Sequence, residues 1–167
     1  MRKNIVLIGL TGCGKSTVGK ALSKELQMDF VDMDVYIEQT EGKTVSEIFV
    51  QDGEPYFRKA ETEASHQLSK TGNTVIATGG GAVLNPENMA LLKKNGILLF
   101  LDRTPEAILK KINLQNRPML RKNRNYLFEL DRQRRHLYEG YADLVVKGLS
   151  NVRETVQAVK KVVTPLL

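Results

Sequence analysis

Residues 9–17 read Gly9-Leu10-Thr11-Gly12-Cys13-Gly14-Lys15-Ser16-Thr17, which matches the pattern G-x-x-x-x-G-K-[ST] of phosphate-binding loops. The apolar run Asn4–Ile8 stands directly before this loop and is too short for a helix, so it predicts a buried strand. Apolar residues at helical spacing follow the loop, at Val18, Ala21, Leu22 and Leu26. The motif therefore stands in the setting it requires, between a strand and a helix.

The residue types of this loop suit the phosphates of a nucleotide. Glycines let backbone N–H groups curl around a phosphate, and the N-terminus of the following helix adds the positive end of its dipole. We expect Lys15 to reach the β- and γ-phosphates, Ser16 to ligate Mg²⁺ directly and Thr17 to lie near the α-phosphate. The expected ATP-binding residues of the loop are Gly12, Cys13, Gly14, Lys15, Ser16 and Thr17.

Length and composition are those of an ordinary globular protein, with 167 residues, 41% hydrophobic and 26% charged. A chain of this size buries roughly 70% of its unfolded surface, so we expect one domain over residues 1–167. The only cysteine is Cys13, which excludes an intrachain disulfide. Neither a secretory leader nor an apolar run of membrane-spanning length occurs, and we expect a cytoplasmic protein.

The positive charge is concentrated in one segment. The net charge is +6, and seven of the lysines and arginines lie between Arg117 and Arg135, against two acidic residues. A nucleic-acid or membrane surface would spread its charge over a face, whereas one short basic segment suits a small, highly charged anion. Composition alone leaves both interpretations open.

Apolar runs alternate with helical patterns along the whole chain, which predicts a doubly wound α/β fold with a five-stranded parallel sheet of the P-loop NTPase type, similar to nucleoside monophosphate kinases. Two segments interrupt the alternation. Residues 33–65 form a mainly helical insertion expected to bind substrate, and residues 112–125, polar and basic with Pro118, are expected to be a mobile lid. The expected strands are Asn4–Ile8, Phe30–Val31, Thr74–Thr78, Ile97–Leu101 and Leu144–Val146.

Asp32 and Asp34 follow the second apolar run. A spacing of two places both carboxylates on the same side of an extended segment, where both can face the phosphate loop. P-loop enzymes need an acidic group at a strand end for magnesium, and a phosphoryl acceptor needs orientation. The alternative is that Asp34 caps a helix beginning at Val35.

Thr78-Gly79-Gly80-Gly81 ends the third strand. Three successive glycines let a ligand lie against the backbone, and the carboxyl edge of an α/β sheet is where ligands bind. A plain turn is the alternative, since glycines are common at turns.

Long basic side chains usually lie on the surface. Without further context we therefore interpret five arginines as solvated surface residues: Arg58, Arg117, Arg132, Arg134 and Arg135. His66 and His136 have no partner at metal-ligand spacing. Asp102 ends an apolar run as a magnesium-binding aspartate would, but Thr104-Pro105 begins a helix just after it, so we expect a capping or turn role.

Taken together, the motifs resemble those of the shikimate kinase family over nearly the whole chain. Residues 9–17 resemble its phosphate loop and Asp32-Met33-Asp34 its D-x-D motif. Phe57-Arg58-Lys59-Ala60-Glu61 resembles F-R-x-x-E, and Gly79–Gly81 the G-G-G turn. Arg117-Pro118-Met119-Leu120 resembles the lid motif R-P-L-L with methionine for leucine, and residues 134–138 resemble R-x-x-L-Y.

The resemblance implies ATP-dependent phosphorylation of the 3-hydroxyl of shikimate on the route to aromatic amino acids, with Mg²⁺ as cofactor. It implies that Asp34 holds the acceptor hydroxyl, that Arg117 closes with the lid onto ATP, and that Asp32 supports the magnesium shell through water. Counting back four residues from Tyr138 selects Arg134 among the late arginines. The implied shikimate site comprises Asp34, Arg58, Gly79, Gly80, Gly81 and Arg134, and the implied catalytic residues are Lys15, Asp34 and Arg117.

The expected partners are ATP and shikimate alone, without nucleic acid or membrane, and we expect a monomer. One alternative is a related kinase of gluconate or of a nucleotide. A more distant one is an ATP-switched module that grips RNA through Arg117–Arg135, although the positive charge there is confined to one short segment. Cys13 is either a reactive thiol shielded by ATP or a buried inert one.

Overall fold

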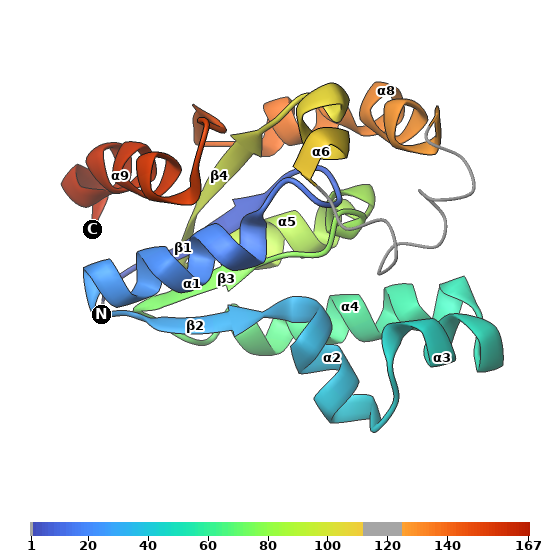
Figure 1. Ribbon diagram of the computed structural model, residues 1–167. Helices are drawn as coiled ribbons and strands as arrows, with labels where there is room; N and C mark the ends of the chain where they lie inside the picture. The colour runs from blue at the N-terminus through green and yellow to red at the C-terminus, as the bar shows by residue number, and fades with distance from the viewer. Residues whose placement is uncertain (1, 112–124) are drawn as a thin grey trace.

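The computed structural model describes residues 2–111 and 125–167 and contains a five-stranded sheet with helices on both faces (Figure 1). The strands are β1 (Asn4–Ile8), β2 (Asp29–Asp32), β3 (Thr74–Ala77), β4 (Gly96–Asp102) and β5 (Leu144–Lys147). The α-helices are α1 (Lys15–Leu26), α2 (Met33–Glu41), α3 (Val45–Gln51), α4 (Glu54–Leu68), α5 (Pro86–Lys93), α6 (Pro105–Lys111), α8 (Asn125–Tyr141) and α9 (Val152–Val163). Short 3₁₀ turns are η1 (Ala82–Leu84) and η3 (Thr164–Leu166).

All strand pairings are parallel, in the order β2-β3-β1-β4-β5. Every residue of β1 is buried, as expected for the central strand of a sheet covered on both faces. The predicted fold class is confirmed. The predicted strands are confirmed with no bound shifted by more than one residue, and Thr78, just after β3, still donates its N–H to Leu7 O at 3.1 Å.

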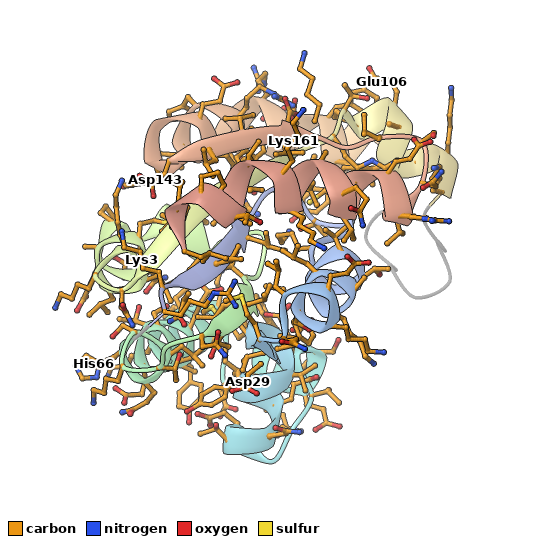
Figure 2. The ribbon with its side chains drawn as sticks, turned by 90° about the vertical axis from the view of Figure 1, so that its left-hand side faces the viewer. Lys3, Asp29, His66, Glu106, Asp143 and Lys161 are labelled. Carbon is orange, nitrogen blue, oxygen red and sulfur yellow. The ribbon has the colours of Figure 1, made fainter. Side chains whose placement is uncertain are left out.

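Helices cover the sheet in two pairs. α1 packs against α9, and α4 packs against α5, with β1 and β3 between the two pairs (Figure 2). α9 begins at Asn151, whose side chain accepts a hydrogen bond from the N–H of Glu154 at 2.9 Å, and its buried face presents Val156, Val159 and Val163. None of the described helices is both long and apolar enough to cross a membrane.

The insertion between β2 and β3 is helical, as predicted, and consists of α2, α3 and α4. A capping box at Thr44 and Glu47 starts α3, and Ile48 buries its apolar side. Phe57 of α4 contacts Phe49 of α3, with ring centroids 4.8 Å apart. These contacts fix α4, which carries Arg58, beside the carboxyl end of β3.

The structure corrects the expected geometry of the two aspartates. β2 ends at Asp32, and Asp34 lies in the first turn of α2, not in an extended segment. Asp32, not Asp34, caps that helix: its Oδ1 accepts hydrogen bonds from the N–H of Asp34 at 2.9 Å and of Val35 at 3.2 Å. The helix therefore begins two residues earlier than the sequence indicated, because the strand ends in a good capping residue.

Candidate active site

The phosphate loop connects β1 to α1 at the centre of the sheet (Figure 1). Gly14 has φ 98° and stands at the N-cap of α1, a conformation that residues with a Cβ rarely adopt. The Cys13 N–H donates to Leu10 O at 3.0 Å, which closes the loop on itself. The Cys13 side chain is only 1% exposed, a setting that fits the buried, inert thiol of the two alternatives.

Lys15 is the buried cation of this loop, with 7% of its surface exposed. Its ammonium donates to Gly9 O at 2.7 Å and to Leu10 O at 3.1 Å, and it lies 3.7 Å from Cys13 Sγ. These carbonyls stabilise a charge that would otherwise be costly to bury. The ammonium therefore sits where the loop backbone curves.

Ser16 and Asp32 bring two oxygen donors together at the edge of the loop. The Ser16 hydroxyl donates a hydrogen bond to Asp32 Oδ2, although the two residues are far apart in sequence. Hydroxyl and carboxylate oxygens are the hard ligands that Mg²⁺ prefers, so the pair fits the predicted ion. Among the described residues no cluster of three or more His, Cys, Asp or Glu side chains forms a metal cage.

A cavity of about 230 Å³ lies between the phosphate loop, the start of α2 and the end of β3. It brings Asp34 to the same space as Lys15, so the prediction that Asp34 faces the loop is confirmed even though its backbone is helical. Thr11 and Thr78 also line it, and sequence reasoning gave neither residue a role. The lining comprises Thr11, Gly12, Gly14, Lys15, Ser16, Thr17, Asp34, Thr78, Gly79 and Gly80.

The Gly79–Gly81 turn packs too closely against its neighbours to carry side chains. A Cβ on Gly79 would lie 3.0 Å from Asp34 Oδ1 and 3.2 Å from Glu61 Oε2. A Cβ on Gly80 would lie 2.5 Å from Thr11 Oγ1, which is inside van der Waals contact. A Cβ on Gly81 would clash with the guanidinium of Arg58. These contacts give each glycine a packing reason, and Gly79 and Gly80 also line the cavity.

Arg58 is held in place by two acidic residues of its own helix. Its Nη1 contacts Glu61 Oε1 at 3.0 Å and its Nη2 contacts Glu54 Oε1 at 3.2 Å. The guanidinium also lies 5.4 Å from the centroid of the Phe57 ring. Arg58 is therefore an oriented side chain beside Gly81, and the interpretation as a solvated surface arginine is wrong.

Glu61 also belongs to this site, although sequence reasoning assigned it no role of its own. It is 1% exposed, and its Oε2 has no hydrogen-bond partner within the described residues. Burial raises the pKa of Glu61 above its ordinary value, while the charge of Arg58 opposes that shift. The negative charge of Asp34 adds to the rise in the pKa, and Arg134 lowers it. Two signals were available: Glu61 ends the motif that resembles F-R-x-x-E, and i and i+3 residues share a helix face, which places it beside Arg58.

The three late arginines differ sharply in their surroundings. Arg132 is 77% exposed and pairs with Glu129 at 2.5 Å, so its surface interpretation is confirmed. Arg134 is half-buried and lies near both Tyr138 and Glu61, whose pKa values it influences. α8 therefore directs Arg134, and not Arg132, toward the charged groups of α4.

Arg135 is a structural residue, which sequence reasoning missed. Its Nη2 contacts Asp102 Oδ1 at 2.9 Å and Asp131 Oδ1 at 3.1 Å, and its guanidinium lies 5.7 Å from the centroid of Phe100. The expectation that Asp102 serves as a cap or turn residue is wrong, because its carboxylate binds Arg135. Thr104 caps α6 instead, accepting a hydrogen bond from Ala107 N at 3.2 Å.

A second cavity, of about 290 Å³, lies against the phosphate loop through Cys13 and Gly14. Its other walls come from α1, α6, α9 and the segments that follow β4 and β5, and comprise Val18, Arg103, Lys111, Leu149, Ser150, Asn151, Val152 and Thr155. The loop thus has a cavity that contains Asp34 and a separate one that does not. All of the predicted lid, residues 112–125, except Asn125 lies outside the described residues, and Arg117 with it.

Comparisons with known proteins agree on one family. The family model for shikimate kinase matches residues 11–164. A curated shikimate kinase of Clostridium botulinum (strain Alaska E43 / Type E3) is 41% identical over 163 residues, covering 98% of each chain. A solved shikimate kinase from Acinetobacter baumannii, in complex with shikimate, superposes with a TM-score of 0.92 at 32% identity, covering 99% of this chain and 95% of that one.

The fold extends to more distant kinases. A gluconokinase from Sinorhizobium meliloti has a TM-score of 0.62 at 16% identity, covering 99% of this chain and 95% of that one, which shows a shared fold alone. The family model and the curated relative cover the phosphate loop, the helical insertion and α8 alike. The chain therefore belongs to the shikimate kinase family.

Proposed function

We propose that this protein transfers the γ-phosphoryl group of ATP to the 3-hydroxyl of shikimate, forming shikimate 3-phosphate and ADP in the biosynthesis of chorismate and the aromatic amino acids. The observation that carries the proposal is the cavity shared by the phosphate loop and Asp34, beside Arg58 and Arg134. A kinase needs a phosphate site and a hydroxyl-orienting group in one space, and an acidic acceptor needs cations nearby.

The phosphate loop binds the ATP phosphates in this proposal. Lys15 redirects its ammonium from the carbonyls of Gly9 and Leu10 to the β- and γ-phosphates, where it neutralises charge that develops during transfer. Ser16, Thr17 and the backbone of Gly12–Gly14 surround the phosphates. The second cavity, which lies on the loop and lacks Asp34, receives the adenosine end of ATP.

Ser16 and Asp32 hold the magnesium ion, Ser16 directly and Asp32 through water. When bound, Mg²⁺ supplies positive charge to the β- and γ-phosphates. The hydrogen bond between Ser16 Oγ and Asp32 Oδ2 supports the assignment, because it places both oxygens on one side of the loop. Asp32 also caps α2, so the residue beside the metal orients the helix that carries Asp34.

Asp34 orients the acceptor hydroxyl toward the γ-phosphate. Phosphoryl transfer passes through a loose transition state, so Asp34 accepts a hydrogen bond and later a proton without needing to be a strong base. Its place in the first turn of a capped helix fixes the carboxylate near Gly79. Rate acceleration then comes chiefly from positioning and charge neutralisation.

Arg58 and Arg134 bind the shikimate carboxylate, and the Gly79–Gly81 turn lets the ring approach the backbone. A guanidinium offers planar, two-pronged hydrogen bonding that suits a carboxylate. Glu61 keeps Arg58 oriented for this contact. Arg117 closes on ATP as part of a lid over residues 112–125, which excludes water from the reaction. The enzyme so proposed acts on small molecules as a cytoplasmic monomer.

A coupled assay of ADP release tests the proposal. Purified protein is given Mg-ATP and, in turn, shikimate, quinate, gluconate and nucleoside monophosphates. We expect turnover that depends on shikimate and on magnesium, with each other acceptor at least about a hundredfold poorer in kcat/KM. Preference for gluconate or for a nucleotide would refute the assignment of the acceptor, and full activity in excess chelator would refute the role of magnesium.

A further inference from the structure

Tyr138 connects α8 to the glycine turn through its hydroxyl. It is 1% exposed, and its hydroxyl donates a hydrogen bond to Gly80 O at 2.6 Å. Its ring stacks on Phe100 of β4, with centroids 5.2 Å apart and planes 26° apart. The ring alone would fill this place in the core, so the hydroxyl adds a contact that phenylalanine would lack.

Arg134 stands one helical turn before Tyr138, on the same face of α8. Burial raises the pKa of the Tyr138 hydroxyl, and the charge of Arg134 partly opposes that rise. The hydroxyl keeps its proton and donates it in the hydrogen bond to Gly80 O, so its lone pairs remain available to a donor one helical turn away.

Gly80 in turn packs against the phosphate loop. A Cβ at residue 80 would lie 2.5 Å from Thr11 Oγ1 and 3.2 Å from Thr11 N. A displacement of the glycine turn would therefore disturb Thr11, which lines the cavity with Lys15. A hydrogen bond and close packing thus connect Tyr138 through Gly80 to the loop, and Arg134 lies one helical turn from Tyr138.

We propose that Tyr138 is a positioning residue for the acceptor: its hydroxyl fixes Arg134 relative to the Gly79–Gly81 turn, and so sets the distance between the acceptor carboxylate and the phosphate loop. This inference rests on the proposed role of Arg134. Tyr138 does not touch the acceptor and acts through its two neighbours. The acceptor it serves is a carboxylic acid whose reacting hydroxyl lies at a fixed distance from the acid group.

Tyr138→Phe removes the hydroxyl and keeps the ring stacked on Phe100. One lost hydrogen bond of this kind corresponds to roughly a tenfold effect, so we expect kcat/KM for shikimate to fall about tenfold while the KM for ATP stays within about twofold. Tyr141→Phe, at a half-buried tyrosine of the same helix, is the matched control and should leave both constants unchanged.

A double-mutant cycle with Arg134→Ala decides whether Tyr138 acts through Arg134. We expect the loss from Tyr138→Phe to shrink to less than about threefold in the Arg134→Ala background, since the residue to be positioned is gone. An undiminished tenfold loss in that background would overturn the inference while leaving the role of Arg134 intact. If Arg134→Ala itself leaves kcat/KM for shikimate unchanged, the proposed role of Arg134 fails, and the inference fails with it.

Melting temperatures separate positioning from simple stabilisation. The Phe variant is expected to fold, because it retains the buried ring. If the Phe variant is unfolded, or loses affinity for shikimate and for ATP in equal measure, the Tyr138 hydroxyl stabilises the fold and does not position the acceptor. Either result would overturn the inference.

Discussion

Single side chains of this site carry charges that burial makes costly, and each depends on a named neighbour. The ammonium of Lys15 is stabilised by the carbonyls of Gly9 and Leu10, and the guanidinium of Arg58 by Glu61. Within the described residues, Glu61 has a hydrogen-bond partner on one oxygen only. Substituting a buried cation that has its partners, such as Lys15, should therefore have a different effect from substituting Glu61, a buried carboxylate with one oxygen unpartnered in the described part of the chain.

Lys15→Met removes the charge and retains a stem of similar length. We expect a folded protein whose kcat falls by about a hundredfold or more, because stabilisation of the transferring phosphoryl group is lost. Steady-state kinetics and a thermal melt measure both parts. Lys20→Met, at an exposed position of α1, is the control and should keep normal turnover. Turnover near normal in the Lys15 variant would refute the role given to the loop.

Glu61→Gln tests the buried carboxylate through pH. Burial raises the pKa of Glu61, so the folded protein binds this proton more tightly than the unfolded chain does. Protonation therefore favours folding, and that contribution is full below the ordinary glutamate pKa and is lost as the pH rises through the raised one. Glutamine stays neutral throughout.

The free energy of unfolding of Glu61→Gln relative to the parent should thus shift in favour of the variant as the pH rises from the ordinary glutamate range through the raised pKa of Glu61. Urea titrations at several pH values provide the measurement. Glu63→Gln, at an exposed position of the same helix, should show no such trend. A flat difference would mean that this carboxyl titrates as in water, and a shift the other way would mean that the charge of Arg58 outweighs burial.

At the scale of elements, the site depends on how closely α4 and α8 approach the glycine turn. Gly81 has φ −95°, a value that any residue adopts, so only the space around this position limits which side chain it can carry. An alanine there would clash with the Arg58 guanidinium, the movable end of a side chain. A Cβ on Gly140, in α8, would have nothing within 4 Å.

Gly81→Ala and Gly140→Ala should therefore have opposite consequences. The first should displace Arg58 and lower kcat/KM for shikimate by about tenfold, with little change in the KM for ATP. The second should leave kinetics unchanged and raise the free energy of unfolding by up to about 1 kcal/mol, because glycine in a helix costs conformational entropy. Equal kinetics in the two variants would rule out a close approach of substrate at this turn.

Arg135 joins α8 to β4 through Asp102, and it is about one third exposed. Arg135→Ala should lower the free energy of unfolding by about 1–2 kcal/mol, less than a fully buried pair would lose because solvent screens the charges. Urea unfolding measures this loss. Arg132→Ala, which breaks only an exposed pair, should change stability by under about 0.5 kcal/mol. Equal losses would contradict the structural role of Arg135.

Over the whole molecule, the sequence predicted the sheet and the phosphate loop because both follow from local pattern. The run Asn4–Ile8, the glycines and Lys15 are contiguous, and hydrophobic period and motif spacing suffice for them. The two aspartates show the limit. Whether Asp34 is extended or helical depends on which aspartate caps α2, and both are good capping residues.

Long-range contacts account for what sequence reasoning missed. The register of Tyr138 selects Arg134 among the late arginines, but the structural role of Arg135 depends on the packing of α8 against β4, where Asp102 binds its guanidinium. Glu61 is buried because α2, α3 and α5 all pack around α4. Neither fact is encoded in spacing, since each requires elements that are distant in the sequence.

Charge is also distributed by the fold as a whole. Arg135 is neutralised by Asp102 and Asp131, and Arg132 by Glu129, whereas Arg134 lies toward the cavity side of α8 near Tyr138 and Glu61. The part of the basic segment that lies in α8 is therefore not a uniform surface. Of its three arginines, one lies near Tyr138 and Glu61, and two are engaged in pairs of their own.

The measurement that tests this account most directly is kcat/KM for shikimate in Arg134→Ala compared with Arg132→Ala. We expect the first to lose about a hundredfold or more, because an acceptor carboxylate is left without its partner, and the second to lose under about tenfold, in a manner suppressed by salt. Arg134→Lys should remain poor, since an ammonium lacks the two-pronged contact. Equal losses in Arg134→Ala and Arg132→Ala would contradict the account, because they would mean that this segment acts only as a diffuse basic surface.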